Sequence, residues 1–149
     1  MQALNGEWRL ATDPENCGRE ARWFASARDE AIVAAVPGVI QQILPDYHGV
    51  VWYWHTFRAT QPAEAHERYL LRFGAVDYLA DVWLNGQLVG SHEGADTPFS
   101  LDVTSALKPD DDNLLAVRVL NPTDEPIDGI RLIETPHRNK NSKNFQPGR

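Results

Sequence analysis

The chain has 149 residues, of which 42% are hydrophobic and 23% charged, and its formal net charge is −7. This length fits one domain, and the composition is typical of soluble globular proteins, which excludes a disordered or fibrous chain. The excess of Asp and Glu argues against binding to nucleic acid, because that function needs clustered Lys and Arg.

The first third of the chain contains one clear strand pattern. Residues 6–12 alternate apolar and polar side chains and stop at Asp13-Pro14, which predicts a β-strand followed by a turn. Residues 15–30 fit either a loop or a short helix, and both alternatives stay open at this point. Residues 36–49 predict a long irregular connection.

The middle of the chain predicts further strands. Residues 50–59 are almost all β-branched or aromatic and predict the strongest strand of the chain, and residues 69–73 predict another. In residues 80–90, Asn85-Gly86 stands between two short β-rich runs. Because Asn and Gly tolerate the positive φ that a type I′ turn requires, this segment predicts a two-residue hairpin.

The alternating pattern returns after the hairpin. Residues 98–103 have period 2, residues 104–107 are consistent with one helical turn, and residues 108–113 predict a polar turn. Residues 115–119 then predict a strand that ends at Asn121-Pro122. The alternation predicts one shared face for Phe99, Leu101 and Val103.

Residues 123–149 differ in character, because prolines interrupt them and basic residues cluster among asparagines. Their only strand-like piece is residues 130–133. Across the chain, short strands joined by long loops predict an all-β fold, an antiparallel β-sandwich of the jelly-roll kind, rather than a propeller or a parallel sheet. We expect residues 1–149 to form this single domain.

No motif of an independent enzyme occurs in the sequence. It lacks G-x-S-x-G, the P-loop and the dinucleotide fingerprint. The five histidines show no metal-ligand spacing, and the single cysteine, Cys17, can form neither an intrachain disulfide nor a zinc site by itself. His92 beside Glu93 is the nearest approach to a titrating pair, and a polar hairpin edge is the favoured alternative. We therefore expect no catalytic residue, metal or cofactor in this chain.

The sequence shows no segment that would address the chain to a membrane. Residues 1–7 have neither the basic nor the apolar region of a secretory signal. No apolar run approaches the roughly 20 residues of a membrane span. We expect no membrane contact and a cytoplasmic location.

Tryptophan is unusually frequent, with five residues in the chain. Exposed aromatic rings can stack on the C–H faces of sugars, whereas buried ones belong to a core or an interdomain contact, and the buried alternative is favoured. Alternation places Trp52 and Trp54 on one face of their strand, which favours a shared core or docking role.

Four blocks of the sequence resemble one known family. Residues 51–57 (VWYWHTF) resemble a W-Y-R-R-x-F strand, and residues 73–86 resemble an F-x-x-V-[ND]-x-x-x-x-V-W-x-N-G block. Residues 90–104 are similar to G-x-H-x-G-G-[YH]-x-P-F-x-x-D-[VI]-T, and residues 113–119 match N-x-L-A-V-R-V. These blocks occur in this order in glycoside hydrolase family 2, which comprises β-galactosidases, β-glucuronidases and β-mannosidases, and the chain resembles it over residues 5–121.

The resemblance implies a galactose-binding-like jelly roll that packs on a catalytic (β/α)8 barrel of the same polypeptide. It places both catalytic glutamates in that barrel. The implied function is that of a non-catalytic, sugar-binding accessory domain of a β-glycosidase that hydrolyses terminal β-galactosides or β-glucuronides. The implied partners are the barrel and the carbohydrate substrate, and a homo-oligomer stays open because family members often assemble.

One site residue follows from the resemblance. In the β-galactosidase branch, the residue after the valine of the second block reaches the substrate pocket, and here that position is Asp77. Its carboxylate would accept hydrogen bonds from sugar hydroxyls. The alternative is that Asp77 only begins a turn, which is a common role of Asp.

The chain departs from the family pattern in two places. Trp54-His55 stands where the family carries an Arg pair, and no Gly-Ile-containing last strand follows residues 135–140. Either residues 130–132 replace that strand or the chain is a fragment of a longer glycosidase, and we favour the fragment. A free-standing carbohydrate-binding module is the alternative function.

Overall fold

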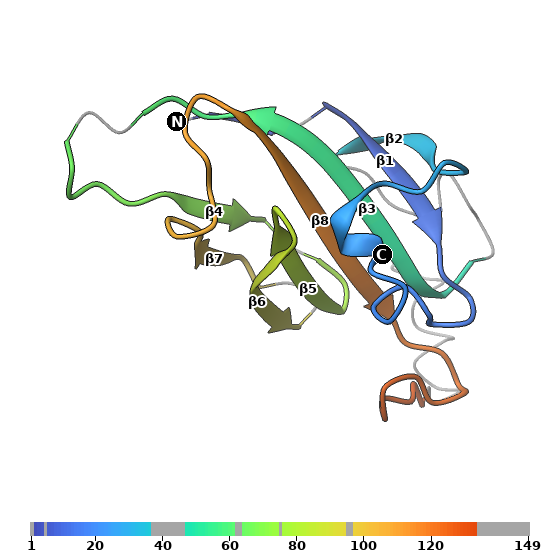
Figure 1. The fold of residues 1–149 in the computed structure, drawn as a ribbon. Helices are drawn as coiled ribbons and strands as arrows, with labels where there is room; N and C mark the ends of the chain where they lie inside the picture. Colours follow the sequence, from blue (N-terminus) through green and yellow to red (C-terminus); the bar gives the residue numbers. More distant parts are fainter. Residues whose placement is uncertain are drawn as a thin grey trace.

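The computed structural model describes residues 2–4, 6–36, 47–61, 64–74, 76–94 and 97–133. Its strands are β1 (Gly6–Thr12), β2 (Ile32–Val36), β3 (Gly49–Arg58), β4 (Leu70–Phe73), β5 (Leu79–Leu84), β6 (Gln87–Glu93), β7 (Phe99–Asp102) and β8 (Asp112–Asn121), and one short 3-10 helix is η1 (Trp23–Ala25). Six strands form one sheet in the order β2-β1-β3-β8-β5-β6, and β4 and β7 form a second sheet (Figure 1).

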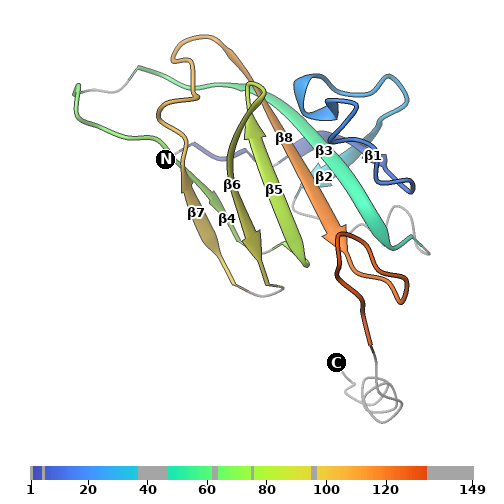
Figure 2. The ribbon, with the colours of Figure 1, turned by 60° about the horizontal axis from the view of Figure 1, so that its bottom comes forward.

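The strand pairs between neighbours are antiparallel, so the all-β, antiparallel sandwich of the jelly-roll kind expected from the sequence is confirmed (Figure 2). β3, predicted as the strongest strand, is central in the large sheet. It pairs with β8 along its whole length, from Gly49 opposite Asn121 to Arg58 opposite Asp112.

The segment between β1 and β3 was only partly predicted. Residues 15–30 form turns with η1 among them. β2 was missed, because its five residues, IVAAV, show no alternation, and only pairing with β1 identifies it as a strand. Residues 37–46 of the predicted irregular connection lie outside the described residues.

The β5–β6 hairpin is confirmed. Asn85 and Gly86 form its turn with φ of 54° and 81°, the left-handed values of a type I′ turn. Asn113, expected in a polar turn, instead lies in β8 with 0% exposure, and its Oδ1 accepts a 2.8 Å hydrogen bond from Asn85 Nδ2. The hairpin tip is thereby tied to β8.

Two short segments, which follow β7 and β8, form turns. The backbone N–H groups of Ala106 and Leu107 both donate to Val103 O, which confirms a single hydrogen-bonded turn. The strand-like residues 130–133 form no strand: Ile127 and Ile130 form an isolated bridge around a tight turn.

Each face of the large sheet carries its own core. The face toward β4 and β7 buries aliphatic side chains, and Phe99, Leu101 and Val103 pack there together, as predicted. On this face a Cβ on Gly90 would lie 2.5 Å from Leu101 Cδ2, so the sheets approach closely. The other face is covered by residues 13–31. No helix within the described ranges is long and apolar enough to cross a membrane.

Candidate functional site

Asp77 lies in a bend immediately before β5, and its side chain is exposed. Val76, which precedes it, packs into the core between the two sheets. The peptide bond from Asp77 to Tyr78 is cis. An exposed carboxylate at a sheet end agrees with a contact to an external ligand and equally with a turn residue.

Tyr78 connects this bend to two other segments. Its backbone N–H donates to Leu120 O at 3.0 Å, and its C=O accepts from the N–H of Gly94 at 2.9 Å. Its hydroxyl donates to Glu93 Oε2 at 2.7 Å. This hydrogen bond, with partial desolvation and the negative charge of Glu93, raises the pKa of Tyr78.

A fully buried arginine lies in the middle of β8. The Arg118 side chain has 0% exposure, and its Nη1 donates to Asp81 Oδ2 at 3.1 Å. Its Nη2 donates to Asp128 Oδ2 and to Asn16 Oδ1, both at 2.7 Å. Ser91 Oγ donates to the other oxygen of Asp81 at 2.6 Å. The guanidinium therefore joins β8 to β5 and to the segments that follow β1 and β8.

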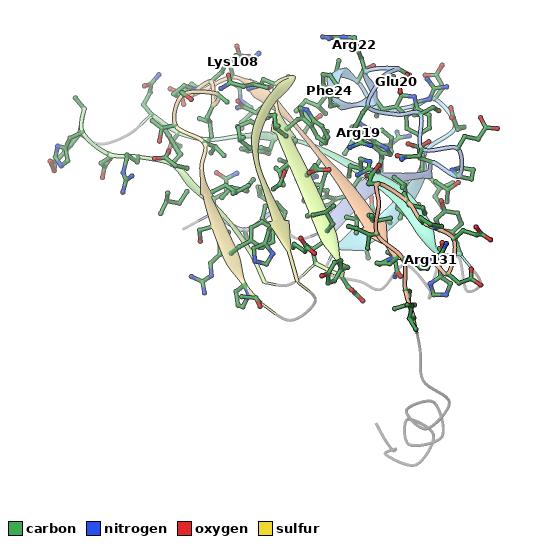
Figure 3. The ribbon with its side chains drawn as sticks, turned by 90° about the horizontal axis from the view of Figure 1, so that it is seen from below. Arg19, Glu20, Arg22, Phe24, Lys108 and Arg131 are labelled. Carbon is green, nitrogen blue, oxygen red and sulfur yellow. The ribbon has the colours of Figure 1, made fainter. Side chains whose placement is uncertain are left out.

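Asp128 receives hydrogen bonds from two further side chains, Arg19 Nη2 at 2.7 Å and Asn16 Nδ2 at 3.0 Å. Figure 3 labels Arg19 on the loop after β1. Burial alone would raise the pKa of Asp128, but the hydrogen bonds from Asn16 and Arg118, the charge of Arg118 and the hydrogen bond from Arg19 together outweigh it and lower the pKa. The cluster thus contains two arginines and two aspartates and carries no net charge: Arg19, Arg118, Asp81 and Asp128.

The loop of residues 13–31 is fastened to the sheet below it. Asp13 has 1% exposure and accepts hydrogen bonds from the N–H of Cys17 (2.9 Å) and Gly18 (2.8 Å) and from Trp52 Nε1 (3.0 Å). A Cβ on Gly18 would lie 2.5 Å from Trp52 Nε1, so only glycine fits this approach. Trp54 Nε1 donates to the carbonyl of the first residue of η1 at 2.7 Å.

A stack of aromatic side chains extends from the sheet to this loop. The ring centroid of Trp52 lies 6.2 Å from that of Trp54 and 5.1 Å from that of Trp83, and Phe24 stacks on Trp83 at 5.2 Å. The guanidinium of Arg22 lies over the Phe24 ring, 5.1 Å from its centroid. In Figure 3 Arg22 projects from the outer end of the loop. The stack therefore ends at the surface with Phe24, whose ring is covered by the Arg22 guanidinium.

The core interpretation of the tryptophans is confirmed. All five are buried, and Trp52 and Trp54 have only 0% and 1% exposure on their shared face. Every Tyr and Phe among the described residues is more than half buried, and none is fully exposed. In that part of the chain, no aromatic ring stands free as a platform for sugars.

The remaining polar candidates have structural contacts. His92 stacks on Phe99 with ring centroids 4.2 Å apart, while Glu93 accepts the hydrogen bond of the Tyr78 hydroxyl, so the two neighbours have different partners. Cys17 is exposed. Within the ranges described, no group of three or more His, Cys, Asp or Glu residues is placed to hold a metal ion.

In comparisons with known proteins, residues 1–131 match the family "Glycosyl hydrolases family 2, sugar binding domain". Among curated proteins, a β-glucuronidase of Paenibacillus borealis is 35% identical over 126 residues, which cover 81% of this chain and 21% of that protein. A β-galactosidase large subunit of Latilactobacillus sakei is 45% identical over 74 residues, covering 50% of this chain and 12% of that protein.

Solved structures give the same result. A β-glucuronidase from Ruminococcus gnavus, in complex with C6-substituted uronic isofagomine, superposes with a TM-score of 0.75 at 28% identity over 83% of this chain and 22% of its own. An uncultured Clostridium β-glucuronidase superposes with a TM-score of 0.71 at 33% identity, over 81% and 22% of the two chains. The chain thus spans about a fifth of the length of these structures and of the Paenibacillus relative.

Proposed function

Since this chain belongs to the sugar-binding domains of glycosyl hydrolase family 2, we propose that it is a non-catalytic domain of a longer β-glycosidase. The polypeptide would hydrolyse terminal β-glucuronides or β-galactosides, and its catalytic barrel would be the main partner of the domain. The names of the relatives and the fifth of their length that the chain covers support this assignment. A cytoplasmic location and assembly into homo-oligomers complete the proposal, and cell fractionation and light scattering of the purified enzyme test them.

The contribution of the domain to substrate binding is assigned to Asp77. The observation that supports it is the exposed carboxylate of this residue, displayed at the end of the large sheet beside the anchored Tyr78. A carboxylate can accept hydrogen bonds from sugar hydroxyls, and charged acceptors form stronger hydrogen bonds than neutral ones. Asp77 would bind and orient the sugar, while bond cleavage belongs to the barrel.

The buried tryptophans bear on the alternative of a free-standing carbohydrate-binding module. Such a module needs affinity of its own, for which exposed aromatic platforms are the usual source. Because every tryptophan of this chain is buried, we expect the isolated domain to bind sugars weakly. Calorimetric titration with galactosides, glucuronides and mannosides tests this: saturable binding by the isolated chain would favour the free-standing module.

The proposed contact is tested in the full-length polypeptide with nitrophenyl β-glucuronide and nitrophenyl β-galactoside. Loss of a hydrogen bond to a charged group costs about 1.5–3 kcal/mol, so Asp77→Ala, which removes the acceptor, should raise KM by about tenfold or more. Asp29→Ala, which changes an exposed aspartate in a turn before β2, is the matched control. Equal KM values for the two variants would remove Asp77 from the substrate site.

A further inference from the structure

The residue that follows Asp77 is held more firmly than Asp77 itself. Tyr78 is bound at three atoms: its N–H to Leu120 O, its C=O to the N–H of Gly94, and its hydroxyl to Glu93. The acceptors and donors come from the end of β8 and from the end of β6, so two strands far apart in sequence meet at this one residue. Tyr78 is therefore a fixed point of the sheet end.

The sheet register brings Glu93 to this position. Leu79, the first residue of β5, lies opposite Glu93 of β6, so the carboxylate can reach back to the preceding tyrosine. Gly94 then adopts φ of 137°, a conformation that side-chain-bearing residues rarely take, and turns its N–H toward Tyr78 O. Glu93 at the end of β6 therefore holds the Tyr78 hydroxyl, and Gly94 directly after it holds the Tyr78 carbonyl.

The position of Tyr78 determines that of Asp77. Consecutive Cα atoms are joined by a planar peptide, so fixing the Tyr78 backbone fixes the Asp77 Cα from which the carboxylate extends. A carboxylate accepts a hydroxyl donor only within a narrow range of distance and angle, and a displacement of about 1 Å loses the contact. We propose that Tyr78 and Glu93 are positioning residues that hold the Asp77 carboxylate in place for a sugar hydroxyl. This inference rests on the proposed role of Asp77.

The test uses the full-length polypeptide and the same nitrophenyl glycosides. Tyr78→Phe removes the hydroxyl and Glu93→Ala removes the carboxylate that accepts it, so each should raise KM about three- to tenfold. The rate constant kcat should stay within about twofold, because a contact made equally in the ground and transition states affects KM alone. Glu93→Gln keeps an amide oxygen that accepts the Tyr78 hydroxyl and should restore KM to nearly the parent value.

A matched control and a double variant separate positioning from other roles. Tyr69→Phe removes a tyrosine hydroxyl that donates to Thr60 O beside the other sheet, and its KM should equal that of the parent. Tyr78→Phe combined with Glu93→Ala should raise KM no further than either change alone, because both remove one hydrogen bond.

Three results would contradict these proposals in different ways. If Asp77→Ala raises KM while Tyr78→Phe and Glu93→Ala do not, the positioning role is wrong and the substrate contact stands. If Glu93→Gln raises KM as much as Glu93→Ala, the charge of Glu93 acts directly and the positioning role is again wrong. If Asp77→Ala leaves KM unchanged, the proposed function of Asp77 fails.

Discussion

Replacing Arg118 by Met removes the charge at the centre of the buried cluster while keeping most of the aliphatic volume. Arg118 donates to Asp81, Asp128 and Asn16, and its side chain has 0% exposure. After the replacement, both carboxylates lose their principal cation, and Arg19 is the one remaining guanidinium of the cluster.

The expected loss of stability follows from the burial of the partners. Removing one member of a fully buried ion pair costs about 3–5 kcal/mol, because the remaining charge stays unpaired and poorly hydrated. The side chains of Asp81 and Asp128 retain 16% and 20% exposure, so water recovers part of this energy. We expect the free energy of unfolding to fall by about 3 kcal/mol, which lowers Tm by about 6–12 °C for a chain of this size.

Urea unfolding of the purified chain, followed by far-ultraviolet circular dichroism, measures this difference. The control is Arg68→Met, which breaks an exposed pair with Asp102 whose side chains are 67% and 43% exposed. Exposed pairs contribute about 0–1 kcal/mol. If Arg118→Met destabilises the chain no more than this control, the cluster does not stabilise the fold in the way that its geometry indicates.

Three further predictions concern other parts of the fold. Gly90→Ala should cost about 1–3 kcal/mol because the new Cβ meets Leu101 at 2.5 Å, whereas Gly74→Ala, with no atom within 4 Å, should leave urea unfolding unchanged. Asn113→Ala should cost about 2–3 kcal/mol in the same assay, since four hydrogen bonds of a buried side chain are lost. The lowered pKa of Asp128 contributes stability that is complete above the unfolded value of about 4 and is lost as the pH falls through the folded value. Asp128→Asn should therefore be less stable at pH 7 yet lose less stability on acidification; parallel acid titrations of the two proteins would contradict this.

Local pattern was sufficient for most strands, because a half-buried strand alternates and a hairpin turn needs residues that tolerate positive φ. Prediction from local pattern failed where neither alternation nor a clear turn signal is present. β2 has five apolar or small residues without alternation and becomes a strand only through its partner β1. Residues 130–133 carry a strand-like composition, but a turn at Asp128-Gly129 folds Ile130 back onto Ile127 instead.

The candidate site was predictable only in part. Asp77 came from the resemblance of its sequence block, whereas the pair of Tyr78 and Glu93 depends on the register between β5 and β6. The buried cluster has only a weak signal in the sequence, because Arg118 is the one charged residue in an apolar run of β8. Its partner Asn16 lies 102 residues away, and no local pattern connects them.

The stacked indoles give the domain an optical signature. Trp52 lies between Trp54 and Trp83 with interplanar angles of 16° and 24°. Rings this close and nearly parallel couple their electronic transitions, so the near-ultraviolet circular dichroism should contain an excitonic contribution that isolated tryptophans lack. All three indoles lie on β3 and β5, so their coupling lasts as long as these strands stay paired with β8, whereas the coupling of Trp23 in η1 to Trp52, with ring centroids 6.1 Å apart, is lost when the loop of residues 13–31 lifts from the sheet. The chain therefore contains its own spectroscopic reporter for local opening of one face, distinct from global unfolding.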